Sequence, residues 1–171
     1  YVIKRFRIKK IGHVLLVFFM MIGILLTLVF AAQFIMPEEY NELIYVRNSN
    51  LNEGAVSQIE NIIPIDGTFF NFSINYIINA IRMMFPMELI KSGVFYLPFF
   101  LFQVFTLYYL VCSIKTLDNK CSKQQIFAIS ILVAYLLTSF IFEPDFGSFV
   151  RHEAATFPVL HLLVLNSIAQ R

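Results

Sequence analysis

VLLVFFMMIGILLTLVFAAQFIM, residues 14–36, is an apolar stretch without a charged side chain. A helix needs about 20 such residues to cross the roughly 30 Å hydrocarbon core of a bilayer, so this stretch predicts a membrane span. The composition of the whole chain agrees, because 58% of its 171 residues are hydrophobic and only 14% are charged. Soluble domains carry about a quarter charged residues. The sequence therefore excludes a soluble globular protein and indicates an all-α membrane protein.

Three further charge-free intervals predict spans at residues 92–114, 124–142 and 154–170. The last of them is short and lies between Glu153 and Arg171, so it needs snorkelling ends or a continuation of the chain. We therefore expect a polytopic transmembrane helix bundle of about four spans, forming a single membrane domain over residues 1–171. Because the chain begins at a tyrosine rather than a methionine, we also expect it to be a fragment of a longer protein.

Residues 68–85 are apolar apart from one polar stripe at helical spacing. The stripe has four members: Asn71, Asn75, Asn79 and Arg82. This pattern predicts an amphipathic helix that lies in the membrane interface and ends at Pro86. The alternative is a fifth span whose polar stripe faces the bundle, and it would reverse the orientation of every segment downstream.

Loop charges favour four spans with a cytoplasmic N-terminus. In that arrangement the cytoplasmic segments carry nine basic residues against one acid, while the external segments carry ten acids against four basic residues. A fifth span would place Lys115, Lys120 and Lys123 outside, against the rule that short cytoplasmic loops are rich in lysine and arginine. We therefore expect residues 37–93 and residues 143–156 to lie outside.

The sequence carries no signature of the common soluble enzyme classes. It has no phosphate-binding glycine-rich loop, no dinucleotide fingerprint, no GxSxG elbow, and no HExxH or CxxC motif. Cys112 and Cys121 lie without His or carboxylate at metal-ligand spacing, so we expect free thiols. We therefore expect no metal, no cofactor and no nucleic-acid partner.

The most informative stretch is FEPDFGSFVRHE, residues 142–153, which packs five ionisable groups between two apolar segments. We predict a charged pocket here, in which Glu143, Asp145 and His152 are the catalytic candidates. A carboxylate could act as general base on a sugar hydroxyl, and Arg151 could stabilise a diphosphate leaving group. The alternative is a salt-bridged loop in which Arg151 pairs with Glu143 or Asp145 and only holds two helices together.

Arg82 is the second candidate for diphosphate binding, because an arginine fork at headgroup depth can hold phosphate oxygens in a bidentate manner. The alternative for Arg82 is snorkelling to lipid phosphate. Asn75 and Asn79 are candidates for bonding sugar hydroxyls, and the alternative for them is a solvated polar face.

DFGSFVRH at residues 145–152 opens the last apolar helix, and NAIRMMFP at residues 79–86 precedes an aromatic span. This arrangement resembles the C-terminal part of bacterial polysaccharide-repeat polymerases, the O-antigen and capsule polymerase-like membrane proteins. Arg82 and Arg151 match the arginines that such a site would use on diphosphate. His152 follows Arg151 as in the family pattern, whereas Glu153 departs from it.

The resemblance implies a multi-pass glycosyltransferase of the bacterial cytoplasmic (inner) membrane, which joins oligosaccharide repeats carried on polyprenyl diphosphate at the external face. Its partners would be membrane lipid and the lipid-linked oligosaccharide. Because family members have many more than four spans, this portion would act with the rest of a longer chain or with partner membrane subunits. The competing hypothesis is a non-catalytic subunit or fragment of a membrane complex, whose spans pack against partners and whose acidic external region docks another protein.

Overall fold

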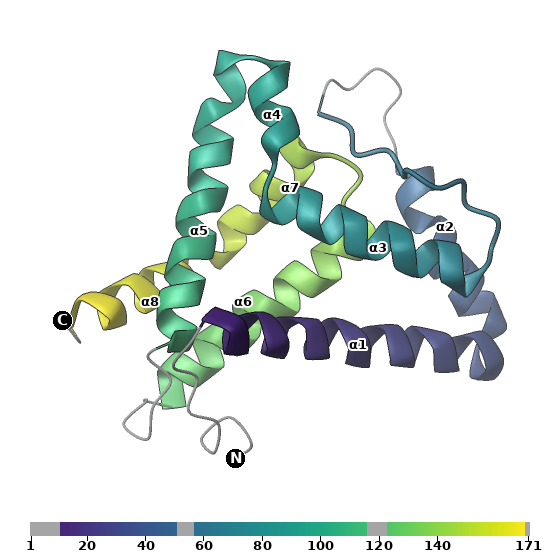
Figure 1. Ribbon diagram of the computed structural model, residues 1–171, viewed down its shortest axis with the longest axis horizontal. Helices are drawn as coiled ribbons and strands as arrows, with labels where there is room; N and C mark the ends of the chain where they lie inside the picture. The colour runs from purple at the N-terminus through teal and green to yellow at the C-terminus, as the bar shows by residue number, and fades with distance from the viewer. Residues whose placement is uncertain (1–10, 51–56, 116–122, 170–171) are drawn as a thin grey trace.

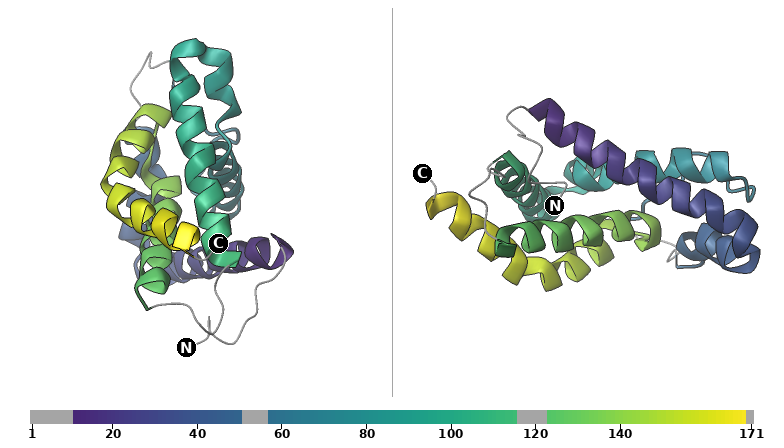
Figure 2. Two further views of the ribbon diagram at one scale, coloured as in Figure 1. Left: turned by 90° about the vertical axis from the view of Figure 1, so that its left-hand side faces the viewer. Right: turned by 90° about the horizontal axis from the view of Figure 1, so that it is seen from below.

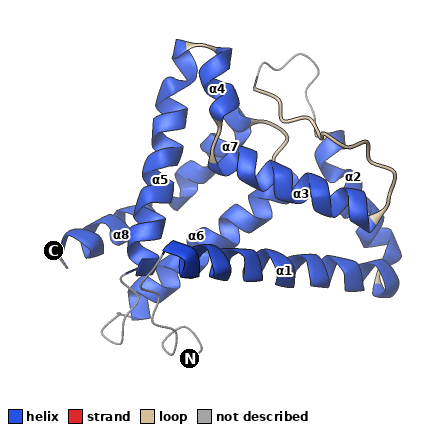
Figure 3. Ribbon diagram, in the orientation of Figure 1, coloured by secondary structure: helices blue, strands red, loops and turns tan. Residues whose placement is uncertain are grey.

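The computed structural model describes residues 11–50, 57–115 and 123–169 (Figure 1). All regular elements in these ranges are helical, and none of them is a strand (Figure 3), which confirms the all-α prediction. The helices are α1 (Ile11–Ile35), α2 (Pro37–Ser49), α3 (Phe69–Met84), α4 (Met87–Ser92), α5 (Leu97–Lys115), α6 (Lys123–Phe142), α7 (Phe146–Glu153) and α8 (Phe157–Ala169), with short 3-10 turns η2 (Val94–Tyr96) and η3 (Ala154–Thr156).

Three helices within the described ranges are long and apolar enough to cross a membrane. They cover residues 16–35 of α1, residues 94–115 of η2 and α5, and the whole of α6. The fourth predicted span falls on η3 and α8, which together rise roughly 25 Å at the usual rise per residue. This length is below the roughly 30 Å of hydrocarbon that a span must cross. The chain is therefore a membrane protein with three helices of spanning length among the described residues, and the predicted fourth span is described only as far as Ala169.

The spanning candidates do not run parallel to one another. Figure 1 shows α5 upright with α1 lying across its lower end, and the left panel of Figure 2 keeps α5 upright while α1 is foreshortened. No single membrane normal is parallel to both axes. Helix α6 runs obliquely between them and packs against α8, α3 and α5.

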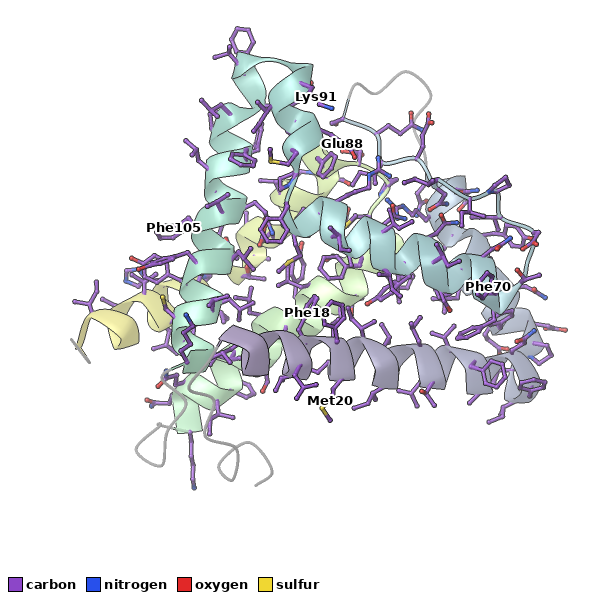
Figure 4. The ribbon with its side chains drawn as sticks, in the orientation of Figure 1. Phe18, Met20, Phe70, Glu88, Lys91 and Phe105 are labelled. Atoms are coloured by element: carbon purple, nitrogen blue, oxygen red, sulfur yellow. The ribbon has the colours of Figure 1, made fainter. Side chains whose placement is uncertain are left out.

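The core of the described residues is centred on α6, whose inward side carries Leu132, Leu136 and Phe140, each no more than 1% exposed. Met83 of α3, Phe149 of α7 and Leu163 of α8 belong to the same buried cluster. Helix α1 adds fewer residues. Figure 4 shows its Phe18 directed toward the other helices and its Met20 directed away from them.

Helix α3 closely matches the predicted amphipathic helix, with bounds Phe69–Met84 against 68–85. The Thr68 side chain caps its N-terminus by accepting a hydrogen bond from the Asn71 N–H, and the helix stops before Pro86. The polar stripe of this helix is not a solvated face, because Asn75 and Asn79 are buried. Tyr76, Ala80 and Met83 on the same helix are buried in the core, while Phe70 is 70% exposed, so α3 has apolar residues on both its buried and its exposed side.

The predicted external loop at residues 143–156 is largely helical, since α7 and η3 occupy residues 146–156. Its first residues join a distant segment of the chain. The Ile59 N–H donates to the Pro144 carbonyl at 2.9 Å, and the Phe146 N–H donates to the Ser57 carbonyl at 2.9 Å. This isolated antiparallel bridge, centred on Gln58 and Asp145, anchors the start of α7 to the segment between α2 and α3.

Candidate functional site

Asp145 starts α7 as its N-cap residue. Its backbone is extended, and its Oδ1 accepts a hydrogen bond from the Ser148 N–H at 2.8 Å. The Ser57 hydroxyl reaches the same oxygen at 3.5 Å. A side chain on Gly147 would place its Cβ 3.0 Å from this oxygen, so a glycine suits the crowded first turn. The carboxylate of Asp145 is thus occupied in building α7.

Glu143 links the end of α6 to two residues of α7. Its Oε2 accepts a hydrogen bond from the Ser148 hydroxyl at 2.6 Å, and its Oε1 lies 2.7 Å from Nδ1 of His152. Ser148 and His152 are four residues apart on a helix and therefore share one face. The Glu143 carboxylate is buried, with both oxygens engaged.

The Glu143 contact orients the imidazole of His152. An ionised carboxylate only accepts hydrogen bonds, so Nδ1 is the ring nitrogen that carries the proton. In the neutral ring, Nε2 is then an acceptor that no hydrogen bond among the described residues occupies, and the His152 side chain is 57% exposed. This is the geometry of a carboxylate-oriented general base.

Arg151 precedes His152 and is exposed. In the described part of the chain the two ion pairs are Arg82 with Glu88 and His152 with Glu143. The alternative in which Arg151 pairs with Glu143 or Asp145 is therefore wrong. Arg151, the residue before His152 on α7, is exposed and forms no ion pair among the described residues.

Arg82 is already engaged in several contacts. It binds Glu88 of α4 in a bidentate manner, with Nε to Oε1 at 2.6 Å and Nη2 to Oε2 at 2.7 Å. Its Nη1 donates to the Glu60 carbonyl at 2.6 Å and to Oδ1 of Asn79 at 3.3 Å. Arg82 therefore joins α3, α4 and the segment before α3, and a phosphate would have to compete with Glu88, which Figure 4 labels on α4.

Asn75 and Asn79 hold the chain segment that passes over α3. The Asn75 amide bonds both main-chain groups of Ile63, accepting from its N–H at 3.0 Å and donating to its carbonyl at 2.7 Å. The Asn79 amide donates to Oδ1 of Asn61 at 2.9 Å. The structure thus places Glu143 and Asp145 just before α7, and Arg151 and His152 on α7 itself. Asn75, Asn79 and Arg82 form a second cluster on α3, and residues 57–61 contact both groups.

The sequence interpretation missed Arg47, which is 5% exposed and donates from Nη2 to the Ile59 carbonyl at 3.0 Å. Burial and, to a smaller extent, the charge of Arg82 lower the pKa of this guanidinium to about 10, and Glu143 acts in the opposite direction. A sequence signal was present: Tyr40, Ile44 and Arg47 recur at helical spacing on the buried side of α2.

Glu153, the last residue of α7, was missed as a titrating group. It is fully buried, and neither of its carboxylate oxygens has a hydrogen-bond partner among the described residues. Desolvation by burial raises the pKa of this carboxyl to about 8. At neutral pH the group is therefore mainly a neutral acid in an apolar setting.

The described residues contain no group of three or more His, Cys, Asp or Glu side chains that could hold a metal ion. Cys112 is a free thiol there. Cys121, the basic N-terminal arm and the lysine-containing turn at residues 116–122, on which the predicted orientation partly depends, lie outside the described ranges. No protein-family model, no curated protein and no solved structure matches the chain.

Proposed function

We propose that this chain belongs to a membrane glycosyltransferase that joins polyprenyl-diphosphate-linked oligosaccharide repeats at the external face of the bacterial cytoplasmic membrane. The observation that carries the proposal is the Glu143–His152 pair, with a contact of 2.7 Å, a buried carboxylate and an exposed imidazole. A base oriented in this way is suited to activating a hydroxyl group. The apolar surroundings suit an acceptor and a donor that are both carried on lipid.

In the proposed reaction, Nε2 of His152 removes the proton of an acceptor sugar hydroxyl as its oxygen attacks the anomeric carbon of the donor. The new glycosidic C–O bond forms while the C–O bond to the lipid diphosphate breaks, and the diphosphate leaves with the electron pair. The proton stays on His152 and is later released to water. Glu143 acts as a positioning residue, since it holds the imidazole and stabilises its protonated form.

Arg151 is the better diphosphate ligand in this proposal. Arg151 is exposed and precedes the base in sequence on α7, and in this proposal its guanidinium stabilises the charge that develops on the leaving group. Arg82 would contribute only after exchanging Glu88 for phosphate. Asn75 and Asn79 support the wall of the site through their contacts with residues 61–63 rather than binding sugar directly.

The glycan profile of cells tests the function. Deletion of the full-length gene should remove long polysaccharide chains while single repeats persist, and wild type should restore them. His152→Gln and Arg151→Ala should fail to restore them at equal protein level, with loss of the base lowering the polymerisation rate by about 100-fold or more. His161→Gln, which changes an exposed histidine on α8 in the same way, is the matched control and should restore the ladder.

An unchanged ladder after deletion would refute the glycan proposal and leave a non-catalytic subunit of a membrane complex. One observation favours that second candidate: α1 exposes Leu16, Ile24 and Leu28 at more than half of their surface. A partner helix could cover this side as well as lipid does. Purification in mild detergent would then recover a stable partner that is lost when these leucines and the isoleucine are changed.

The proposed orientation puts the N-terminus in the cytoplasm and residues 37–93 outside. It can be tested with single cysteines at Glu60 and Lys115, both exposed, in a background that lacks Cys112 and Cys121. An impermeant thiol reagent added to intact cells should label position 60 and spare position 115. The opposite labelling would overturn the orientation and with it the external location of His152.

A further inference from the structure

A small cavity lies between α2, α3, α6 and the segment that precedes α3, whose places in the fold Figure 1 shows. Its volume is about 20 Å³. Its walls are mostly apolar side chains: Leu43, Ile44, Ile65, Phe72, Tyr76, Phe140 and Ile141. The remaining lining residues are Arg47, Asn61, Asn75 and Asn79. The cavity thus combines an apolar wall with one cation and three amides.

Arg47 has donor capacity that the described residues do not satisfy. Its Nη2 donates to the Ile59 carbonyl, but its Nε is buried without any hydrogen-bond partner. A buried N–H of a charged group that lacks an acceptor costs free energy, and a bound acceptor recovers it.

The amide groups of the cavity leave few acceptors for this nitrogen. Both Asn75 groups bond Ile63, and the Oδ1 atoms of Asn61 and Asn79 accept hydrogen bonds from Asn79 and Arg82 respectively. Each asparagine Nδ2 carries a second N–H beyond the one it already donates. The polar side of the cavity is therefore richer in donors than in acceptors.

The charges around Arg47 favour an anion over a neutral ligand. Arg82 repels its guanidinium, whereas the one acid that acts on it, Glu143, has both oxygens committed to Ser148 and His152. Arg47 forms no ion pair within the described ranges. Because its pKa is only lowered to about 10, the guanidinium remains charged at neutral pH. A buried cation without a close counter-charge is costly, and a bound anion removes much of that cost.

The size of the cavity limits the anion. A volume of about 20 Å³ is close to what one water molecule requires, which is roughly 10–15 Å³. A tetrahedral phosphate needs room for four oxygens and does not fit, whereas a halide is a single atom and is much nearer in size to a water molecule. We propose that Arg47, with the amides of Asn61 and Asn79, forms a buried chloride-class anion site that ties α2 to α3 independently of the proposed transferase function.

The experiment measures thermal unfolding of the detergent-purified full chain in sodium chloride, sodium bromide, sodium phosphate and sodium gluconate at matched ionic strength. Chloride and bromide should raise the melting temperature by about 3 to 5 °C for each tenfold increase above the dissociation constant. Gluconate and phosphate should not. Equal stabilisation by all four salts would show that the cavity holds water only, and stabilisation by phosphate as strong as by chloride would refute a site of this size.

Two variants and one direct measurement assign the effect to Arg47. Arg47→Gln should abolish the halide dependence, while Lys91→Gln, which removes one exposed positive charge on α4, should keep it. Halide dependence that survives in Arg47→Gln would overturn the proposal. If that variant does not fold, chloride NMR on the wild-type protein tests the site directly. Specific binding should broaden the chloride signal, and bromide should reverse the broadening whereas gluconate should not. Absence of such broadening would refute the site.

Discussion

Replacing Glu153 with glutamine should stabilise the protein at neutral and alkaline pH. The carboxyl has a pKa of about 8 in the folded chain against an ordinary value of 4.5, because it is fully buried without a partner. The folded state therefore binds one more proton than the unfolded state between these two values. Stability falls as pH rises through this window, because the unfolded chain releases the Glu153 proton and the folded chain keeps it.

The magnitude follows from the two pKa values. Each pH unit in the window costs about 1.4 kcal/mol, so the wild-type protein loses about 3 kcal/mol between pH 4.5 and pH 7 and about 5 kcal/mol by pH 8. Glutamine has nearly the same shape and does not ionise. Glu153→Gln should consequently gain up to about 3 kcal/mol at pH 7, a rise in melting temperature of about 6 to 12 °C for a chain of this size.

The assay is thermal unfolding of wild type and variant in one detergent, at intervals from pH 4 to pH 9. The two curves should meet near pH 4 and diverge above it, and the divergence should level off above pH 8. Glu42→Gln, which changes an exposed glutamate of α2, is the control and should follow wild type throughout. Parallel curves for wild type and Glu153→Gln across the whole range would refute the assignment of a buried, neutral Glu153.

Three further predictions concern the elements that position the site. Asp145→Ala should remove the cap of α7 and lower the free energy of unfolding by about 1 kcal/mol in chemical denaturation, whereas Asp145→Ser should retain most of it. Tyr76→Phe should cost about 1 kcal/mol in the same assay, because the buried hydroxyl donates to a main-chain carbonyl of α6 at 3.0 Å. Gly67→Ala should lower the free energy of unfolding by about 1–2 kcal/mol, since the φ of Gly67 is +80° and the new Cβ would meet a tyrosine hydroxyl at 3.3 Å. Gly23→Ala is the control: it has open space in α1 and should be neutral or slightly stabilising. Equal effects of the two changes would contradict this reasoning.

Hydropathy and capping patterns located the helices well because both depend on local sequence. The predicted segments at 14–36, 68–85 and 124–142 correspond to α1, α3 and α6 within a few residues. The span predicted at 92–114 begins later as an α-helix, because Gly93 has a φ of +129° and the chain first makes a 3-10 turn. The short apolar interval at 154–170 corresponds to η3 and α8, which the structure describes as far as Ala169.

The candidate site was predictable only where its residues are neighbours in sequence. Glu143, Asp145 and His152 were found because they share one charged stretch, but their separate roles depend on α7 starting at Phe146, which places Ser148 and His152 on one face. Arg47 donates to the Ile59 carbonyl, and Asn79 donates to Oδ1 of Asn61. These contacts join segments that are distant in the sequence, and the local composition of neither segment predicts the contact.

The bridge between residues 57–59 and 144–146 also has a consequence for the biogenesis of the protein. A ribosome that adds about 5–20 residues per second makes Pro144 roughly 4–17 s after Ile59. During that interval the Ile59 N–H lacks its later acceptor, the Pro144 carbonyl. This N–H must therefore stay hydrated while the apolar helices between the two segments enter the bilayer. The nascent chain is therefore most open to proteases of membrane quality control before α7 emerges, and a stop codon placed after α6 should yield a product that is degraded rather than a smaller stable protein.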